Sequence, residues 1–289
     1  MRYLVAIGGN AITSEKKLGK VSEAIARLRK EGNSIILTHG NGPQVGELAL
    51  EENKSLALLT AQTEAEIGLE IRGSLIDELG KKGLKNDVVI MITPVLVDGN
   101  DDEFREPTKP IGKFLTPREA KVMRERGFSI KKLKGGLRRV VPSPKPLDIA
   151  GLGVIKELLS RGHIVIAAGG GGVAMKRRGK REVYSDAVID KDYVSSLLAS
   201  LAGVDRMVIL TNVDGAYLDF GSRSQLLINT VRAEEAERMI REGEFEEGSM
   251  LPKVRACVDF ARRTGKKAAI GSISDPYAAL RLKSTVVTP

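Results

Sequence analysis

The sequence has 289 residues but only one cysteine, two histidines and no tryptophan. One cysteine cannot build a disulfide framework, and no histidine or cysteine spacing matches a zinc site. Cys257 lies in a helical-looking apolar stretch, which favours a buried small side chain. No serine–histidine pair suggests a nucleophile either. These absences exclude disulfide-rich scaffolds, and we expect no protein-held metal.

Long hydrophobic runs are also missing. The first apolar run, residues 3–7, is too short for a signal peptide and ends in glycines. No stretch approaches the roughly 20 apolar residues that span a bilayer. We therefore expect a cytoplasmic protein without a membrane partner. High charge, few amides and the single cysteine are also typical of thermophilic proteins.

Aromatic residues make up only 4% of the chain, although its formal net charge is +9. Residues 113–139 contain ten Lys or Arg against two acidic residues, a local charge of +8. Such a basic segment suits either nucleic acid or small anions. No aromatic residues interleave with it in a stacking pattern, which argues against a single-strand binder.

Apolar runs typical of buried strands alternate with helical patterns along most of the chain. Expected strands cover residues 3–7, 34–38, 88–93, 164–168, 207–211 and 268–270. Expected helices cover residues 21–30, 42–52, 61–81, 149–161 with Asp148 as N-cap, 190–201, 233–242 and 253–264. This alternation predicts an α/β fold with a mainly parallel central sheet and helices on both faces.

Residues of about 94–146 fit the alternation poorly, since they hold seven prolines and the main basic segment. We interpret them as a small lid inserted into a single domain of residues 1–289.

Three expected strands end directly in glycine-rich loops. The loops are residues 8–11 (Gly-Gly-Asn-Ala), 39–46 (His-Gly-Asn-Gly-Pro-Gln-Val-Gly) and 169–172 (four glycines). Ligands of open α/β sheets bind at the carboxyl ends of strands, where glycine lets a backbone approach an anion. An ordinary turn remains the alternative for the first loop, and a tight packing crossover for the third. The spacing matches neither a P-loop nor a dinucleotide fingerprint.

Polar residues follow the later strands. Lys191 stands between Asp190 and Asp192, and these carboxylates suit positioning the lysine, although a solvated salt-bridged turn is the alternative. Lys253 lies in the first turn of a helix, where a cation opposes the helix dipole, so an anionic partner is expected. Residues 211–217 suit a nucleotide edge, with a plain Asp-Gly turn as the alternative. For His39, a structural role is favoured over acid–base catalysis.

Glycine loops with separated lysines suit phosphoryl transfer, which needs in-line positioning and positive charge rather than a covalent nucleophile. In this order the motifs resemble carbamate kinase of the amino acid kinase family, over nearly the whole chain. The motifs are residues 8–11, 39–46, 107–112 (Pro-Thr-Lys-Pro-Ile-Gly), 138–146 (Arg-Arg-Val-Val-Pro-Ser-Pro-Lys-Pro), 187–192 (Ala-Val-Ile-Asp-Lys-Asp) and 248–253 (Gly-Ser-Met-Leu-Pro-Lys).

The resemblance implies an open αβα sandwich with a small protruding subdomain, usually assembled as a homodimer. It implies the reversible reaction ATP + carbamate = ADP + carbamoyl phosphate, with Mg²⁺ carried on the nucleotide. In arginine metabolism of fermenting cells, such enzymes usually work towards ATP.

The resemblance also implies roles for individual residues. Lys191 and Lys253 neutralise the phosphates, and Asp192 orients both lysines. The residues expected at the carbamoyl and moving phosphoryl groups are Gly8, Gly9, Asn10, Gly40, Asn41 and Gly42. Those expected beside the nucleotide are Gly170, Gly171, Asp190, Thr211, Asn212, Asp214, Tyr217 and Met250.

A lysine of the subdomain is expected to close over the substrate. A one-residue gap before Arg138 places this lysine at Lys131, with Lys132 and Lys134 as rivals. Residues 61–68 (Ala-Gln-Thr-Glu-Ala-Glu-Ile-Gly) depart from the family, which commonly has a less charged segment with Ser-Gln-Gly there. That departure leaves one alternative open, and the basic segment at 113–139 leaves a second. One is a kinase of the same fold with another acceptor, as in acetylglutamate, uridylate or phosphonate kinases, and the other is a basic anion- or nucleic-acid-binding protein with a retired kinase site.

Overall fold

An eight-stranded sheet lies at the centre of the computed structural model, which describes residues 1–12, 14–51, 54–85, 87–133, 135–179 and 181–289. Its order is β15-β17-β16-β12-β1-β2-β9-β3. The strands are β1 (Arg2–Ile7), β2 (Ser34–His39), β3 (Val88–Ile90), β9 (Ile164–Ile166), β12 (Arg206–Thr211), β15 (Thr230–Arg232), β16 (Lys267–Ser272) and β17 (Thr285–Thr288). The pairs from β3 to β16 are parallel, and β17 pairs antiparallel with β16.

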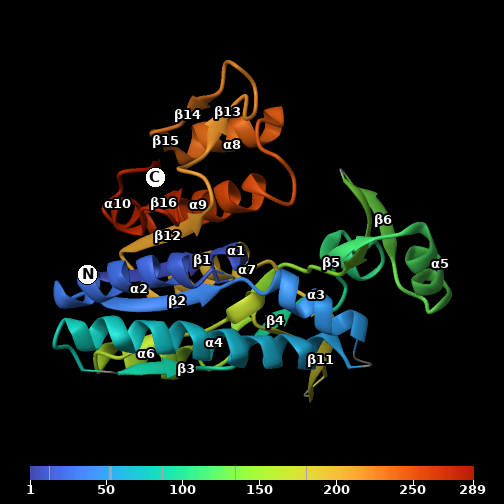
Figure 1. Cartoon of the computed structure of the whole chain (residues 1–289), viewed down its shortest axis with the longest axis horizontal. Coiled ribbons are helices and arrows are strands. Elements are labelled where there is room, and N and C mark those ends of the chain that lie inside the picture. The colour runs from blue at the N-terminus through green and yellow to red at the C-terminus, as the bar shows by residue number, and fades with distance from the viewer. Residues whose placement is uncertain (13, 52–53, 86, 134, 180) are drawn as a thin grey trace.

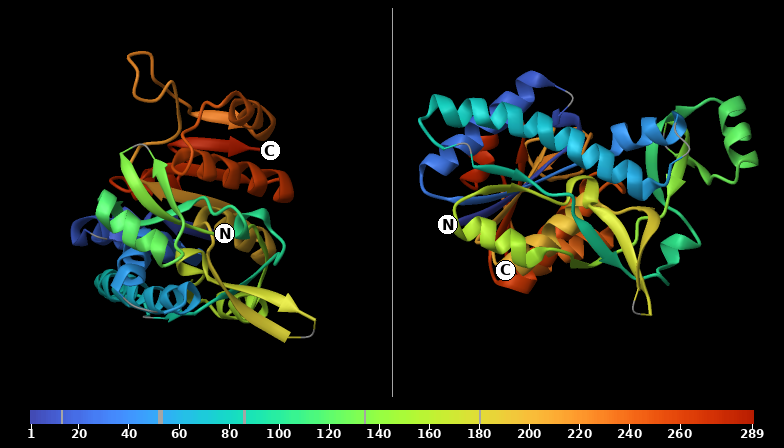
Figure 2. Two further views of the ribbon diagram at one scale, coloured as in Figure 1. Left: turned by 90° about the vertical axis from the view of Figure 1, so that its right-hand side faces the viewer. Right: turned by 90° about the horizontal axis from the view of Figure 1, so that it is seen from below.

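Helices cover both faces of this sheet (Figures 1 and 2). Along β1, Tyr3, Val5 and Ile7 pack on one face with α2 (Glu15–Lys30), α4 (Leu56–Lys81) and α10 (Pro276–Leu280). Leu4 and Ala6 point to the other face, where α6 (Leu152–Ser160), α7 (Lys191–Ala202), α8 (Ala233–Glu242) and α9 (Met250–Thr264) pack. Because strand side chains alternate between faces, one apolar run fills two cores. The expected αβα sandwich is confirmed.

Two smaller sheets extend from this centre. The first has the order β11-β10-β4-β8 and contains β4 (Pro94–Val97), β8 (Pro146–Ile149), β10 (Val173–Arg178) and β11 (Arg181–Val188). The second has the order β5-β7-β6 and contains β5 (Lys109–Leu115), β6 (Ile130–Leu133) and β7 (Gly136–Val141). With α5 (Pro117–Glu125), this second sheet projects from the body as the small subdomain (Figure 1). Short elements complete the chain: α1 (Gly9–Ile12), α3 (Gly42–Glu51), η1 (Asp102–Phe104), η2 (Gly169–Gly171), β13 (Tyr217–Leu218) and β14 (Leu226–Leu227).

The subdomain joins the body through a close backbone contact and one arginine, Arg139. A Cβ added to Gly46 of α3 would lie 1.9 Å from the Gly112 nitrogen of β5, so these backbones touch. Arg138 donates to the Gly112 carbonyl (2.8 Å), and the buried Arg139 donates to the Ala49 carbonyl (2.8 Å). Arg138 therefore ties β7 to β5 within the subdomain, and Arg139 docks the subdomain on α3.

Glu103 ties together the two chain segments that enter and leave the subdomain. Its carboxylate accepts from the Thr108 nitrogen (3.0 Å) and hydroxyl (2.5 Å), and from the Ser143 nitrogen (3.1 Å). Both segments are therefore fixed at the base of the projection.

Several sequence-based boundaries are wrong, since the helices expected from residues 21 and 61 begin earlier, at Glu15 and Leu56. Two further errors lie beside β4. The helix expected over residues 149–161 begins at Leu152, with Gly151 as its N-cap at φ 77°. Asp148 instead belongs to β8, where it pairs with Leu96. The strand expected over residues 88–93 ends at Ile90, and a new strand begins at Pro94. In both places the pairing of β4 with β8 and β10 outweighs the local pattern.

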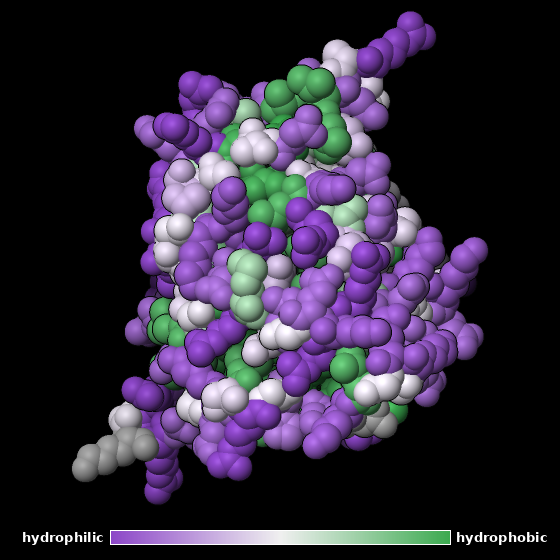
Figure 3. All heavy atoms as spheres, turned by 90° about the vertical axis from the view of Figure 1, so that its left-hand side faces the viewer, coloured by the Kyte–Doolittle hydropathy of each residue, from purple (hydrophilic) through white to green (hydrophobic). Residues whose placement is uncertain are grey.

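The surface carries the chain's many charged residues. The face in Figure 3 is mostly hydrophilic, with hydrophobic side chains only in separate patches. Among the described residues, no helix is both long enough and apolar enough to cross a bilayer.

Gly46→Ala is expected to lower the stability of the chain, because its methyl group would overlap the Gly112 backbone. Overpacking of this kind costs about 1–3 kcal/mol. Denaturant unfolding measures the loss. The matched control is Gly73→Ala in α4, where nothing lies within 4 Å and alanine favours a helix. Equal stability of the two variants would contradict the close contact.

Candidate active site

The loops that follow β1, β2 and β12 meet at one edge of the central sheet, beside the glycine turn after β9. Together with the first turns of α3, α7 and α9 they enclose a cavity of about 250 Å³, which we call the central cavity. Its lining residues are Gly8, Gly9, Gly40, Asn41, Gly42, Pro43, Lys109, Gly170, Asp190, Lys191, Asp192, Thr211, Asn212, Gly248, Lys253 and Ile273. Helix N-termini and parallel-strand ends both favour anions.

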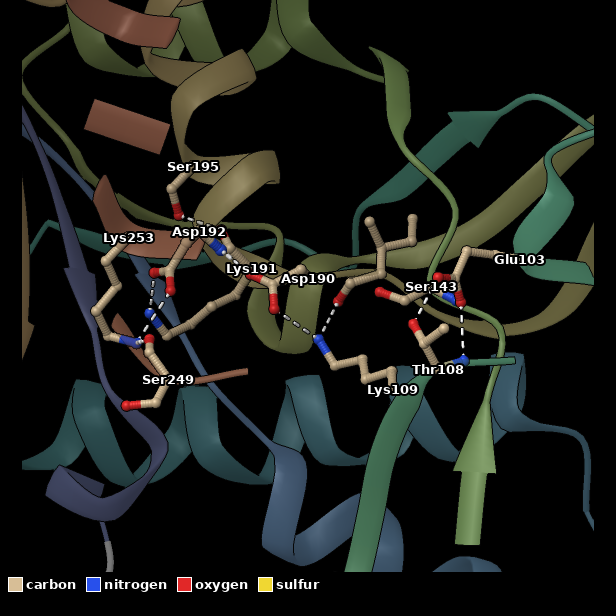
Figure 4. Close-up of polar contacts among 11 residues, drawn as sticks. Glu103, Thr108, Lys109, Ser143, Asp190, Lys191, Asp192, Ser195, Ser249 and Lys253 are labelled. Atoms are coloured by element: carbon tan, nitrogen blue, oxygen red, sulfur yellow. Dashed lines mark hydrogen bonds and ion pairs between the residues drawn. The ribbon is translucent and has the colours of Figure 1, made fainter. Parts of the chain in front are cut away.

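Asp192 holds two lysines together beside this cavity (Figure 4). One carboxylate oxygen pairs with Lys191, and the other lies 3.3 Å from Lys253 Nζ. Lys253 Nζ also donates to the Ser249 carbonyl at 2.8 Å. The carboxylate is nearly inaccessible, whereas the lysines keep 12% and 16% of their side chains exposed. The lysines can therefore reach a ligand that Asp192 cannot.

The ionisation of this trio follows from its contacts. Burial alone would raise the pKa of Asp192, but Lys191 and Lys253 outweigh it and hold that pKa below its usual range. Burial likewise opposes the charge of Lys253, yet Asp192 raises its pKa overall. Lys253 therefore stays charged at neutral pH.

Lys109 adds a third cation from the subdomain side. Its Nζ lies 3.1 Å from the Asp190 carboxylate and 3.2 Å from the Ile189 carbonyl (Figure 4). Asp190 also caps α7, because its other oxygen accepts from the Asp192 nitrogen at 2.9 Å. Three ammonium groups against two carboxylates leave the cluster with one net positive charge.

A second cavity of about 330 Å³, which we call the side cavity, adjoins the first. The two share Thr211, Asn212, Gly248 and Lys253 in their linings. The remaining lining residues of the side cavity are Val213, Tyr217, Phe220, Glu244, Phe245, Glu246, Ser249 and Met250. The rings of Tyr217 and Phe220 lie 5.8 Å apart, and Phe220 is 61% exposed. An aromatic, partly apolar cavity beside a cationic one suits a molecule with a flat ring and a charged tail.

Glycines of the first two loops allow the strand ends to pack closely. The Gly8 nitrogen donates to Leu210 and the Gly40 nitrogen donates to Ile7, both at 3.0 Å. A Cβ on Gly40 would lie 2.9 Å from the Gly9 nitrogen. Gly8 and Gly40 therefore contribute close packing rather than free N–H donors.

Most of the predicted site residues come together in the two cavities, but some do not. Asp214 is exposed and lines neither cavity. Gly171 also lies outside both linings, where an added Cβ would meet the Ile189 carbonyl at 2.2 Å. Asn10 belongs to α1, but its side chain lies outside the described part of the structure.

Two of the three candidate lid lysines can be located in the described structure, and neither is at the cavities. Lys131 and Lys132 are exposed on β6, and neither lines the central or the side cavity. Lys134 lies outside the described residues.

The sequence did not identify Lys109, Phe220 or Phe245 as site residues, and it did not predict that Gly248 lines both cavities. The signal for Lys109 was present, because it lies in the motif at residues 107–112 that was assigned to the subdomain alone. No comparable signal marked Phe220 or Phe245, since only the folded chain brings them beside Met250.

His39 lies behind the central cavity rather than in its lining. It is fully buried, and burial lowers its pKa to about 4. A neutral imidazole of this kind fits a structural role and cannot act as an acid at neutral pH.

This chain has full-length relatives in both sequence and structure. The amino acid kinase family model matches residues 1–272. A carbamate kinase-like protein of Escherichia coli (strain K12) is 38% identical, over 99% of this chain and 98% of the relative. A carbamate kinase of Thermoplasma acidophilum is 39% identical, over 99% of this chain and 98% of the relative.

Solved structures agree with these relatives. A protein of Aeropyrum pernix K1 has a TM-score of 0.92 at 39% identity, covering 100% of this chain and 99% of that one. Carbamate kinase from Giardia lamblia bound to AMP-PNP has a TM-score of 0.89 at 33% identity, covering 99% and 98%. The similarity to these proteins extends over essentially the full length, so the chain belongs to the amino acid kinase family.

Proposed function

We propose that this chain is a carbamate kinase, which transfers a phosphoryl group reversibly between ATP and carbamate. The observation that carries the proposal is Lys191 and Lys253, held by Asp192 where the central and side cavities meet. The relatives named carbamate kinase, and the one solved with AMP-PNP, support the same reaction.

Charge and position account for the chemistry. A carbamate oxygen attacks the γ-phosphorus while the bond to the β-phosphate oxygen breaks, so the bonding electrons leave with ADP and no proton moves. Phosphoryl transfer of this kind needs in-line reactants and positive charge around the moving group. Lys191 and Lys253 supply that charge, and Thr211, Asn212 and Met250 line the adjoining side cavity for the nucleotide.

Mg²⁺ is proposed to arrive with the nucleotide. Within the described residues, no group of three His, Cys, Asp or Glu could hold a metal. The carboxylates of Asp190 and Asp192 are occupied by lysines. Mg²⁺ commonly keeps waters and binds through substrate phosphates, so this donor set fits a nucleotide-borne ion that neutralises phosphate charge.

The resemblance to carbamate kinases supports a physiological direction towards ATP synthesis from carbamoyl phosphate, as part of arginine metabolism in the cytoplasm. A different acceptor is the second candidate, favoured by the unusual segment at 61–68 and by the Escherichia coli relative described only as carbamate kinase-like. A screen of acids and phosphates by ADP release separates the two candidates.

Lys131 is the best candidate for closing over the substrate. Residues opposite each other in antiparallel strands share a face, so Lys132 shares its face with Leu137 and Lys131 with Arg138. Leu137 packs onto the small core under α5. Figures 1 and 2 show α5 on one side of this sheet, and the register puts Lys131 on the opposite face, which supports Lys131 over Lys132.

A homodimer is proposed through α4 and the edge strand β3. Leu58 and Leu69 of α4 are 54% and 62% exposed, and Ile92 just after β3 is 53% exposed. Eleven residues make about three helical turns, so the two leucines lie on one side of α4. Exposed apolar side chains beside an unpaired sheet edge commonly mark an interface.

Lys191→Ala is expected to lower kcat for ATP formation from carbamoyl phosphate and ADP by about 10²–10³, because one charge at the moving phosphoryl group is lost. A coupled ATP assay measures this. Lys266→Ala, which breaks the surface pair with Asp205, is the matched control and should keep full activity. A fully active Lys191→Ala protein, or a wild type that prefers another acceptor, would refute the proposal.

Lys131→Ala is expected to lower kcat/KM for carbamoyl phosphate by about tenfold or more, through loss of a closing charge. Lys132→Ala serves as its neighbour on the opposite face and should change kcat/KM by less than about twofold. The reverse ranking in the same steady-state assay would reject the assignment of Lys131.

Leu69→Glu is expected to convert the dimer to a monomer, since it buries a charge in an apolar interface. Light scattering after size-exclusion chromatography measures the mass. Leu226→Glu, at an equally exposed leucine of β14, should remain dimeric. A monomeric wild type, or an unaffected Leu69→Glu protein, would exclude this interface.

A further inference from the structure

Glu64 is a buried carboxylic acid that the phosphoryl-transfer reaction leaves without a role. It lies on α4 with 1% of its surface exposed. One carboxyl oxygen accepts from the Gly169 nitrogen at 2.9 Å, and the other accepts from the Thr93 nitrogen at 3.2 Å. Glu64 therefore joins the glycine turn after β9 to the segment that leads into β4.

The backbone that Glu64 holds is unusual. Ala168 has φ 51°, and Gly170, Gly171 and Gly172 have φ values of 64°, 95° and 73°. Ala168 in the left-handed region costs energy, so surrounding contacts must hold it there. The Ala168 nitrogen donates to the Thr93 hydroxyl at 2.9 Å, next to the Glu64 contacts. Glu64 and Thr93 thus form one anchor for this turn.

The anchored turn forms a wall of the central cavity. Gly170 lines that cavity, and a Cβ added to it would lie 2.2 Å from the Asn41 side chain. Asn41 is itself held by a hydrogen bond of 2.9 Å from its amide to the Thr63 hydroxyl. Thr63 and Glu64 are neighbours on α4, so this helix positions both Asn41 and the glycine turn.

The surroundings of Glu64 contain little charge. Thr93 and Gly169 face it from the two segments that it joins, and both are uncharged. His39 of β2 lies against Gly169 and is neutral, since burial lowers its pKa to about 4. Lys191 of α7 acts electrostatically on His39. On α4 itself, Glu66 is exposed and accepts from Gln62.

We propose that Glu64 is a positioning residue: it holds the glycine turn of residues 168–172 against Asn41, and its proton keeps this wall of the central cavity uncharged. Glu64 binds the Gly169 N–H of the turn and the Thr93 N–H beside it, which keeps Gly170 at the wall of the cavity where the anion would bind. An ionised Glu64 would instead place a negative charge behind that anion and weaken its binding. The kinetic part of this inference rests on the proposed function, but the ionisation does not.

The sign of the pH effect follows from burial. Burial raises the pKa of Glu64 from its ordinary value of 4.5 to about 8 in the folded chain. Between those values the unfolded chain loses the proton and the folded chain keeps it. Stability therefore falls as pH rises across this window, and above about pH 8 the folded carboxyl also ionises.

Glu64→Gln tests both parts, with Glu66→Gln as the same change at an exposed site on the same helix. A glutamine side chain has one acceptor oxygen instead of two. Either the Gly169 N–H or the Thr93 N–H would therefore face the NH₂ group and lose its hydrogen bond. We expect KM for carbamoyl phosphate to rise about tenfold at pH 7, with KM for ADP within about twofold. The wild-type rise of this KM through about pH 8 should be absent in Glu64→Gln.

Unfolding measurements supply a readout that needs no enzymatic activity. From pH 5 to 7.5, the unfolding constant of the wild type should rise relative to that of Glu64→Gln by up to about tenfold per pH unit. Glu66→Gln should follow the wild type. Protection against heat by inorganic phosphate should also be weaker in Glu64→Gln.

Each outcome decides a separate point. If Glu64→Gln matches Glu66→Gln in KM and in phosphate protection, Glu64 does not position the turn. If the unfolding constants keep a fixed ratio across pH, Glu64 carries no proton at neutral pH and that half of the inference is wrong. A wild type that cannot use carbamoyl phosphate refutes the proposed function alone, and the unfolding and phosphate experiments then decide the inference. Should Glu64→Gln not fold, a wild-type KM without a change near pH 8 would still overturn it.

Discussion

A single buried carboxylate, that of Asp192, links the two helices that carry the cationic centre. It is the first-turn residue of α7, and it binds Lys191 of its own helix and Lys253 of α9. Burying an ion pair costs desolvation energy that one partner rarely repays. Here two lysines offset this cost, and each keeps part of its side chain exposed. Remove the carboxylate, and the first turns of α7 and α9 would bring two like charges together.

The arrangement of backbone around this centre depends equally on missing side chains. Gly40 lies against Gly9, Gly170 against Asn41 and Gly46 against Gly112, all closer than any Cβ permits. These contacts join β1 to β2, the glycine turn to the second loop, and the subdomain to α3. Glycine, which loses more conformational entropy on folding than other residues, therefore occurs where two backbones must meet.

The sequence predicts the sandwich well because its signals are local. Continuous apolar runs such as Tyr3 to Ile7, and strand ends in glycine, both survive folding unchanged. The gathering of Lys191, Asp192 and Lys253 also follows, since parallel strands place their loops on one edge. The predictions that fail are those that depend on long-range strand pairing. Asp148 looks like a helix cap until β8 pairs with β4.

The misplaced site residues have the same cause. Asp214 follows a strand that ends at the site, yet its side chain faces solvent. Lys109 seemed part of a distant projection, but β5 begins at the base of the subdomain, where Lys109 meets Asp190. Within the unusual segment at 61–68, the carboxyl group of Glu64 binds backbone behind the cavity, a contact that the sequence pattern did not reveal.

The difference between Lys109 and Lys131 shows how the subdomain can act. Both belong to its three-stranded sheet, but Lys109 is at the base and Lys131 is on the edge strand β6. Glu103, Gly46 and Arg139 fix the base to the body, so a rotation about it would move β6 far more than Lys109. A charged substrate that attracts Lys131 would favour the rotated state, since a ligand shifts a population by its differential affinity. The basic charge of residues 113–139 would then favour closure over an anion, with Lys109 in place before and after.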